Sequence, residues 1–264
     1  MAVANSIILL MNNVVEINKV SKAFGSHVVL DNVSLNVEEG ENMIVFGQSG
    51  TGKSVLLKCI VRLLEPDKGD IFIEGTNVLT LRIKELNDIR KNLGFLFQGA
   101  ALYDSMSVRE NLEFPLVRHF TFTDAEREEK IKSVLEKVSL EEAIDKMPSE
   151  LSGGMKKRIG LARSIITEPK LMLYDEPTTG LDPITSKEIS SLILELQKSL
   201  KMTSIVVTHD LLCAEIIADR AIVLNEGIVQ HEGTITELTT SRDPFLRNFF
   251  SHEIVEEQNR RNNV

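Results

Sequence analysis

Eight residues between an apolar run and a predicted helix constrain the fold of this chain more than any other stretch. The sequence GQSGTGKS, residues 47–54, follows the apolar run 42–46 and precedes a predicted helix over 53–64. Its glycines allow the backbone to curl around an anion, so that successive N–H groups and the helix N-terminus point at a phosphate. A plain glycine turn is the alternative. The strand–loop–helix context favours a phosphate cradle formed by Gly47, Gln48, Ser49, Gly50, Thr51, Gly52, Lys53 and Ser54.

Two side chains of the cradle and two acidic residues further along the chain have predicted chemical roles. In a loop of this type Lys53 reaches the β- and γ-phosphates of a nucleotide, and Ser54 offers its hydroxyl to Mg²⁺. A second apolar run, 171–175, ends on Asp175 and is followed by Glu176. Ligands of open α/β sheets bind at the C-terminal ends of strands. We therefore predict that Asp175 helps to hold Mg²⁺ and that Glu176 orients or deprotonates an attacking water.

The order of predicted elements indicates an α/β fold. The opening third reads as strands separated by turn signals, and from about 99 to 167 the pattern is helical. Strand-like and helix-like segments alternate after that, which predicts a largely parallel sheet with helices on its faces. The helical block in the middle is predicted to be an inserted subdomain. The predicted boundaries are a flexible N-terminus over 1–12, one domain over 13–250 and a polar tail over 251–264 that is disordered or bound to a partner.

Composition excludes several classes of protein. Thirty basic and 39 acidic side chains leave a formal net charge of −9, which argues against broad attraction to nucleic acid or to anionic lipid. No Lys or Arg precedes Lys19, and no apolar run approaches the length of about 20 residues that a membrane span needs. Cys59 and Cys213 are far apart and outside any metal-binding pattern, so they are predicted to be reduced structural thiols. A cytosolic chain is expected, with any membrane role exerted through a partner.

The stretch LSGGMKKR, residues 151–158, begins another predicted helix with a serine and two glycines. Alone, it could be a helix cap with a flexible approach. Together with the cradle, the run ending in Asp175 and Glu176, and a histidine after the next strand, it makes the chain resemble the ATP-binding cassette (ABC) ATPases over roughly residues 13–250. The resemblance implies a P-loop NTPase fold with a mixed sheet core, an N-terminal antiparallel β-subdomain and the inserted helical subdomain.

The resemblance also implies roles for individual residues. Glu176 is the catalytic glutamate, His209 the switch histidine, and Gln98 the glutamine that senses Mg²⁺ and water. Phe24 stands where the family usually places an aromatic residue, often tyrosine, against adenine, and it keeps the stacking without the hydroxyl. The signature Ser152, Gly153 and Gly154 would contact the γ-phosphate of ATP held by a second subunit, and Asp182 ends the D-loop. The residues following Gly154 are predicted to form a solvated helix face, with no function assigned to Lys156 or Lys157.

The segment after Gln98, GAALYDSMSVRENLEFPL, lies where ABC ATPases receive a membrane subunit, and it resembles the version in ATPases of MCE-associated (Mla-type) phospholipid transporters. Tyr103 and Met106 are expected to help receive a coupling helix of the permease; the alternative is that they only fill the subdomain core. The implied assembly is a homodimer at the cytoplasmic face of the inner membrane, with a separate permease and an MCE-domain protein.

Three other readings are open at this stage. The first is the ATPase of a lipoprotein-release or other exporter system, which the corresponding stretch fits less well. The second is an ABC protein that works on DNA or the ribosome, but the chain has neither a long coiled-coil insertion nor a second cassette. The third is a nucleotide-dependent binding module that does not hydrolyse ATP, which the presence of Glu176 and His209 disfavours.

Overall fold

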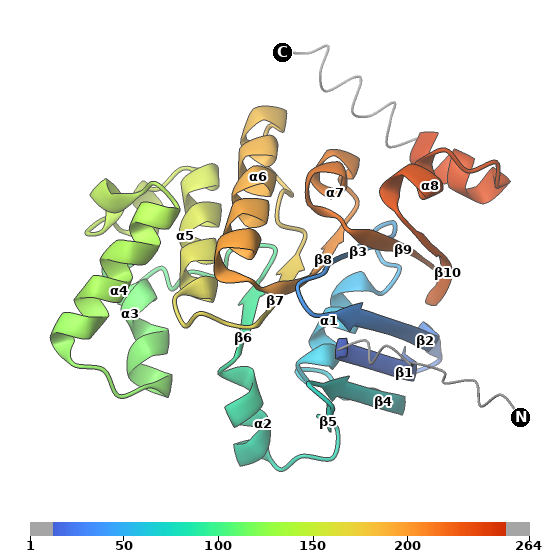
Figure 1. Ribbon diagram of the computed structural model, residues 1–264, viewed down its shortest axis with the longest axis horizontal. Coiled ribbons are helices and arrows are strands. Elements are labelled where there is room, and N and C mark those ends of the chain that lie inside the picture. The colour runs from blue at the N-terminus through green and yellow to red at the C-terminus, as the bar shows by residue number, and fades with distance from the viewer. Residues whose placement is uncertain (1–12, 252–264) are drawn as a thin grey trace, which may run out of the picture.

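The computed structural model describes residues 13–251, and a six-stranded mixed sheet forms its centre (Figure 1). Five strands are parallel, and only the edge pair at one side is antiparallel. The strand order is β10 (Ile228–Gly233), β9 (Arg220–Asn225), β3 (Asn42–Phe46), β8 (Thr203–Thr208), β7 (Leu171–Asp175) and β6 (Leu93–Leu96).

The central strands are buried on both faces, which explains their continuous apolar sequences. Every residue of β3, β7 and β8 is buried, as expected for parallel strands covered by helices. Ile44 and Phe46 of β3 face one hydrophobic core, and Met43 and Val45 face the other. The parallel pairing places the C-terminal ends of β3, β7 and β8 at one edge, where the loops that carry the predicted site residues begin.

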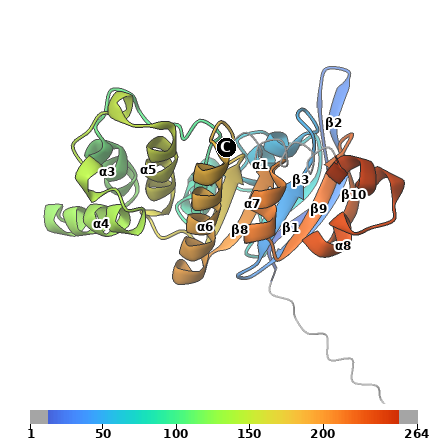
Figure 2. The same cartoon turned by 90° about the horizontal axis from the view of Figure 1, so that it is seen from above.

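The first core lies under helices at one face of the sheet (Figure 2). It is covered by α5 (Gly153–Ile165), α6 (Pro183–Leu200), α7 (Leu211–Ile217) and a helical stretch beyond α8 (Ile235–Thr239). Phe249 and Phe250 of that last stretch pack edge-on against Phe46, with ring centroids 6.3 and 5.3 Å away. The described C-terminal residues are therefore part of the core rather than an appendage.

The second core joins the other face of the sheet to a four-stranded antiparallel sheet. The order of that sheet is β2 (His27–Glu38), β1 (Asn13–Phe24), β4 (Lys68–Ile73) and β5 (Thr76–Asn77). Helix α1 (Lys53–Ile60) contributes Leu56, Leu57 and Ile60 to the same core. The N-terminal antiparallel β-subdomain is confirmed, and α1 starts at the predicted residue but is shorter than 53–64, because Arg62 adopts a left-handed backbone conformation.

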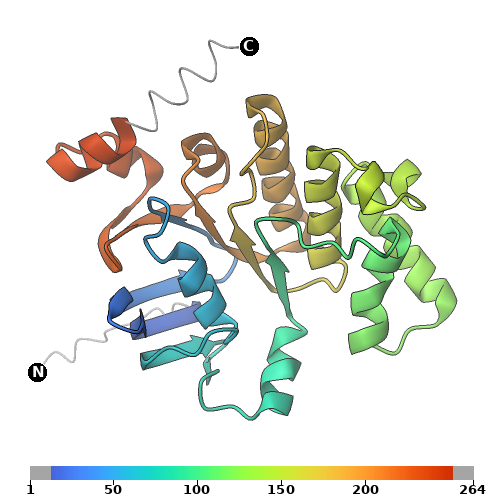
Figure 3. The same ribbon diagram turned by 180° about the vertical axis from the view of Figure 1, so that it is seen from behind.

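A helical subdomain projects from one end of the sheet (Figure 2). After α2 (Ile83–Arg90) and β6, the chain crosses to it in the connection visible from behind (Figure 3). The subdomain contains α3 (Val108–His119), α4 (Asp124–Lys137), two short 3₁₀ turns (Glu141–Ala143 and Pro148–Glu150) and α5. Thr123 caps α4 in a capping box with Glu126, and Ser107 caps α3 in the same way with Glu110, so local sequence sets both helix starts.

Three smaller predictions can be compared with the fold. Cys59 and Cys213 are free and buried, and burial raises their pKa values to about 11 and about 12. Within residues 13–251, no helix combines the length and apolarity that a bilayer crossing requires. The predicted N-terminal segment 1–12 lies outside the described residues, as does the predicted tail apart from Ser251.

One buried amide holds the segment that enters the helical subdomain. The Asn111 side chain is fully buried and accepts a hydrogen bond from the Tyr103 N–H at 2.8 Å. It donates to the carbonyls of Tyr103, Met106 and Ser107 at 3.1, 2.9 and 3.0 Å. Since buried backbone groups without partners are costly, this amide determines the path of residues 103–107.

Replacing Asn111 by alanine is expected to lower the free energy of unfolding by about 2–3 kcal/mol, because it removes a fully buried amide and leaves the Tyr103 N–H and the Met106 carbonyl without their hydrogen-bond partner. Urea denaturation followed by circular dichroism measures the change. The matched control is Asn248→Ala, at an exposed position, which should change the stability by less than about 0.5 kcal/mol. Equal stabilities of the two variants would contradict the role given to Asn111.

Candidate functional site

A hollow of about 400 Å³ brings together most of the predicted catalytic residues. The phosphate cradle, Gln98 two residues after β6, and Glu176 directly after β7 all border it, although they are far apart in sequence. Its lining consists of Val29, Ser49, Gly50, Gly52, Lys53, Ser54, Val55, Gln98 and Glu176. The parallel sheet brings these residues together, because the C-terminal ends of β3, β6 and β7 lie on the same side of the sheet.

The backbone of the cradle requires glycine at two positions. Gly52, at the start of α1, has a φ of 101°, and a Cβ there would lie 2.7 Å from the Val29 carbonyl oxygen. A Cβ on Gly47 would lie 2.4 Å from Thr51 Oγ1. The first approach holds the loop tightly against β2, and the second keeps its turn tight. A glycine-rich loop that leads into a helix N-terminus in this way is an arrangement that binds phosphate.

Lys53 is buried and lies inside the loop. Its Nζ donates to the carbonyl oxygens of Gly47 and Gln48 at 2.5 and 3.1 Å. The same ammonium lies 3.2 Å from Glu176 Oε1. A buried positive charge is thus held at the centre of the cradle by groups that a phosphate can replace.

Ser54 and Asp175 meet as the sequence predicts for a Mg²⁺ site. Ser54 Oγ donates to Asp175 Oδ1 at 2.7 Å, and Asp175 is buried. One hydroxyl and one carboxylate, with phosphate oxygens and water completing the octahedron, are a typical ligand set for Mg²⁺ in nucleotide sites. The residues present therefore fit this ion.

Both the backbone and the carboxylate of Glu176 are held by neighbouring groups. Its φ is 50°, in the left-handed region, and its N–H donates to the Val207 carbonyl at 3.0 Å. Oε2 lies 2.8 Å from His209 Nδ1, and Oε1 faces Lys53. Burial raises the pKa of the carboxyl, but His209 and Lys53 outweigh it, so the pKa is below the usual value for glutamate. The side chain is ionised at neutral pH and can accept a proton.

The signature residues lie outside the lining of this hollow. Ser152 Oγ caps α5 by accepting from the Met155 N–H at 3.3 Å, and both Ser152 and Gly153 are exposed. Gly154 packs so closely on α6 that a Cβ would lie 2.8 Å from Thr185 Cγ2. Asp182 caps α6 by accepting from the N–H groups of Ile184 and Thr185 at 3.0 Å each. These predicted residues form a second, outward-facing group.

Phe24 also lies apart from the lining residues. It ends β1 opposite His27 in a hairpin, is 49% exposed, and has the Lys22 ammonium 5.6 Å from its ring centroid. The exposed ring is available for stacking, and β2 connects it to Val29 in the wall of the hollow. Its assignment to adenine stays a prediction.

The prediction that Lys157 lies on a solvated helix face is wrong. Its side chain is buried, and Nζ donates to the Gln98 carbonyl and, at 3.3 Å, to the Glu176 carbonyl. Burial lowers the pKa of this lysine, while the charges of Glu176 and Asp175 oppose the shift. Helical spacing could have indicated that Lys157 is buried, because Lys157, Leu161 and Ser164 lie at positions i, i+4 and i+7 of α5 and therefore share one helix face. All three side chains are buried.

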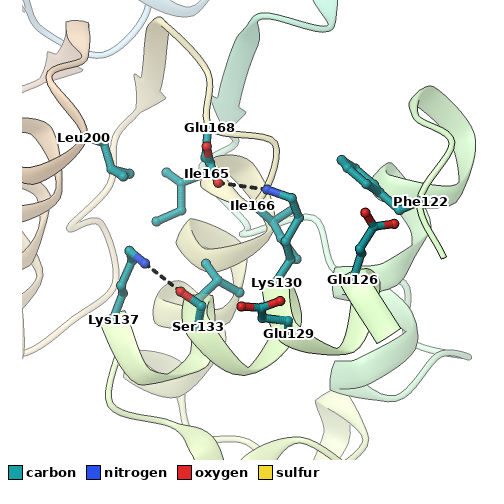
Figure 4. A pocket seen from close by; sticks show the side chains of 11 residues that line it. Phe122, Glu126, Glu129, Lys130, Ser133, Lys137, Ile165, Ile166, Glu168 and Leu200 are labelled. Atoms are coloured by element: carbon teal, nitrogen blue, oxygen red, sulfur yellow. Dashed lines mark hydrogen bonds and ion pairs between the residues drawn. The ribbon is translucent and has the colours of Figure 1, made fainter. Parts of the chain in front are cut away.

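A separate hollow of about 350 Å³ lies among α4, the end of α5 and the end of α6 (Figure 4). Its floor contains Ile165, Ile166 and Leu200, and its rim carries the Lys130–Glu168 ion pair at 2.8 Å. It shares no lining residue with the phosphate cradle. Nothing in it provides the phosphate-binding amides or the acidic residues described above.

Comparisons with known proteins agree with this geometry. A family model described as ABC transporter matches residues 30–179. The intermembrane phospholipid transport system ATP-binding protein MlaF of Haemophilus influenzae is 39% identical over 241 residues, which are 91% of this chain and 91% of that protein. The probable ribonucleotide transport ATP-binding protein mkl of Mycobacterium tuberculosis is 38% identical over 237 residues, 90% of this chain and 66% of that protein. The chain thus spans just under two thirds of this mycobacterial relative.

A solved structure shows the same fold. The ATP-binding cassette MJ0796, as a dimer in a post-hydrolysis state with ADP and phosphate bound, is 33% identical, with a TM-score of 0.77 over 84% of this chain and 98% of its own. The matching family model covers more than half of the chain, and it includes the cradle, the signature and Glu176. The chain therefore belongs to the ABC transporter family, as an ATP-binding cassette.

Proposed function

We propose that this chain is the ATP-hydrolysing subunit of an ABC transporter that moves phospholipid between bacterial membranes. The observation that carries the hydrolytic part is the placement of Glu176, 3.2 Å from Lys53 and 2.8 Å from His209 at the wall of the cradle. The oxygen of a water attacks the γ-phosphorus in line, the bond to the β–γ bridging oxygen breaks, and a water proton passes to Glu176.

The other residues of the hollow stabilise charge. Lys53 and the cradle amides face the phosphates, and His209 steadies the γ-phosphate. Ser54, Asp175 and Gln98 would hold Mg²⁺. When bound, this ion neutralises the charge that develops on the phosphate oxygens. Glu176 has a lowered pKa, so it supplies an ionised carboxylate at neutral pH.

A second copy of the chain completes the site in this proposal. Ser152, Gly153 and Gly154 are outward-facing at the N-terminus of α5 and do not line the hollow of their own chain. Backbone N–H groups at the N-terminus of a helix suit the γ-phosphate of a nucleotide held by a partner. The related cassette MJ0796 is described as dimeric. Two chains would then enclose two ATP molecules, with Asp182 near the shared surface.

Phospholipid is the proposed substrate of the whole transporter. The MlaF relatives of Haemophilus influenzae and Escherichia coli, 39% and 38% identical, are named for intermembrane phospholipid transport. The segment after Gln98 resembles the corresponding stretch of Mla-type ATPases. We propose a peripheral location at the cytoplasmic face of the inner membrane, with a permease and an MCE-domain protein in the complex. The ATPase of a lipoprotein-release or other exporter system is the second candidate.

The surface that would receive the permease is a small basic and aromatic groove of about 180 Å³. Tyr103 is 44% exposed there, with its ring centroid 5.1 Å from that of Phe114 and 5.6 Å from the Arg163 guanidinium carbon. Arg90, Lys91 and His119 also line the groove, and Met106 is half-buried nearby in sequence. Aromatic and basic side chains of this kind suit a helix with an apolar face and a carboxylate.

Replacing Tyr103 by aspartate is expected to abolish co-purification of the integral membrane subunit and to leave the Kd for ATP within about twofold, because the change replaces an aromatic ring that lines the groove by a charge. The measurement is affinity purification from solubilised native membranes, with the ATP affinity determined on the isolated chain. The control Val117→Asp alters a 59% exposed residue of α3 that does not line the groove. Retention of the membrane subunit by the Tyr103 variant would contradict this docking surface.

The proposed function as a whole is tested by isolating the complex from native membranes and analysing its proteins and lipids. A permease and an MCE-domain protein with bound phospholipid, together with ATP hydrolysis, support the proposal. A permease of another class with different cargo would favour the exporter reading, and absence of hydrolysis by the intact complex would contradict the ATPase assignment.

A further inference from the structure

Helix α5 connects the two groups of site residues described above. It begins at Ser152, in the outward-facing signature, and passes behind the hollow that contains Glu176. Two basic side chains of this helix reach the segment that follows β6. Lys157 donates to the Gln98 carbonyl, and Arg163 donates to the carbonyl oxygens of Ala101 and Ala100 at 2.6 and 3.4 Å.

The segment after Gln98 depends on these contacts for its shape. Ala100 and Ala101 have φ values of 60° and 50°, so two successive non-glycine residues are left-handed. Such conformations persist only where the surroundings hold them. The side chains of Lys157 and Arg163 donate to three carbonyl groups within four residues of this backbone, those of Gln98, Ala100 and Ala101.

The same lysine also holds the backbone of the glutamate. Glu176 is left-handed as well, with its N–H bonded to Val207 and its carbonyl bonded to Lys157 Nζ at 3.3 Å. The peptide groups on both sides of the Glu176 Cα are therefore anchored, one by the sheet and the other by α5. Because χ angles start from the backbone, this anchoring sets the direction of the carboxylate toward the hollow.

A purely structural role would not require a charged group at this position. Lys157 is 6% exposed, and its ammonium donates to two neutral groups, the carbonyls of Gln98 and Glu176. A buried ammonium is costly unless its environment compensates for the charge. Burial lowers the pKa of this lysine, and the negative charges of Glu176 and Asp175 offset only part of that effect. The two carbonyl contacts, one of them to Glu176 itself, therefore hold the ammonium at the backbone of the site at a cost that packing alone would not require.

We propose that Lys157 is a positioning residue for ATP hydrolysis: one ammonium ties the backbone at Gln98 and at Glu176 to the helix that begins with the signature. The inference rests on the proposed function. It adds that the alignment of Glu176 depends on where α5 lies. In the proposed dimer, the signature end of α5 contacts the nucleotide held by the partner. Closure of the dimer would therefore set the position of α5, and Lys157 would pass that position on to the backbone of Glu176.

The test compares Lys157→Met and Lys157→Gln with the control Lys156→Met in the full-length chain. Methionine keeps the length and flexibility of the side chain but removes the donors, whereas glutamine keeps two N–H donors on a shorter chain. Lys156 is on the same helix and only partly buried, and it has no place in the proposed site. The measurements are kcat, KM and Kd for ATP, the melting temperature, and amide hydrogen exchange over 98–101 and 176–179.

Lys157→Met is expected to lower kcat at least about tenfold, as misplacement of a catalytic group does, with the Kd for ATP within twofold and faster exchange over both segments. Lys157→Gln should fall between this variant and the unaltered protein, and Lys156→Met should match the unaltered protein. A folded Lys157→Met protein whose kcat stays within twofold of the unaltered value overturns the inference.

The experiment also covers a Lys157→Met variant that does not fold and an unaltered chain that does not hydrolyse ATP. If Lys157→Met does not fold, Lys157→Gln decides: lowered kcat with faster exchange over 98–101 supports the inference, and an unaltered kcat with unaltered exchange overturns it. If the unaltered chain hydrolyses no ATP, the proposed function fails first, and exchange in Lys157→Met then tests the positioning alone. Unchanged exchange in that variant would overturn it.

Discussion

Replacing Glu176 by glutamine is expected to lower the rate of ATP hydrolysis at least about 100-fold while leaving ATP binding intact. The amide keeps the shape of the side chain and its place between Lys53 and His209, but it cannot accept a proton from water. Because the phosphates remain uncleaved, the two chains should stay closed around ATP. The variant should therefore elute as a dimer in ATP and Mg²⁺, whereas the unaltered protein should not accumulate in that form.

Phosphate release and size-exclusion chromatography with light scattering provide the two measurements for this variant. Glu195→Gln is the matched control, since it makes the same change at an exposed position of α6 and should hydrolyse ATP normally. Turnover by the Glu176 variant within a fewfold of the unaltered protein would remove this residue from the proposed mechanism.

The second large effect concerns sharing of the site between two chains. Lys53→Met is expected to inactivate the cradle of its own chain, because it removes the buried ammonium. Ser152→Glu is expected to inactivate the site of the partner, because it directs a carboxylate at the γ-phosphate. Each homodimer should then be inactive, but a mixed dimer contains one site built from an unaltered cradle and an unaltered signature.

The mixed dimer, purified through two different affinity tags, should recover up to about half of the unaltered activity per dimer, since one of two equivalent sites is intact. The homodimers of each variant serve as controls and should show less than about 1% of that activity, given the charge stabilisation that each change removes. If each chain formed a complete site alone, the mixed dimer would be as inactive as both homodimers, and the shared-site proposal would fail.

Several features of the site could be predicted because they depend on short segments. The cradle between β3 and α1, the Asp175–Glu176 pair after β7 and the helix cap at Ser152 are each set by neighbouring residues. The loop motif also predicts glycine at Gly47 and Gly52, but the backbone carbonyls that exclude a side chain at these positions belong to the distant strands β9 and β2. The family resemblance extended these predictions to Gln98 and His209, and Gln98 does line the hollow.

Other features could not be predicted from local patterns. The sequence predicts an exposed Lys157, because a run of basic residues usually lies on a solvated helix face. The structure buries it because α5 packs against the ends of β6 and β7, where two backbone carbonyls converge. Asn111 likewise looks like an ordinary helical amide, and only the return of residues 103–107 over α3 gives it four backbone partners.

By itself the sequence determined the class of fold, the order of its elements and the identity of the phosphate-binding loop, because backbone conformation, helix capping and alternation of apolar residues act over a few residues. Tertiary structure alone decided which distant groups meet. The carboxylate of Glu176 receives Lys53 and His209, and its backbone receives Lys157, because parallel strands end at one edge and α5 packs across that edge. Electrostatic and hydrogen-bonding contacts of this kind depend on distances in space, which spacing along the chain does not specify.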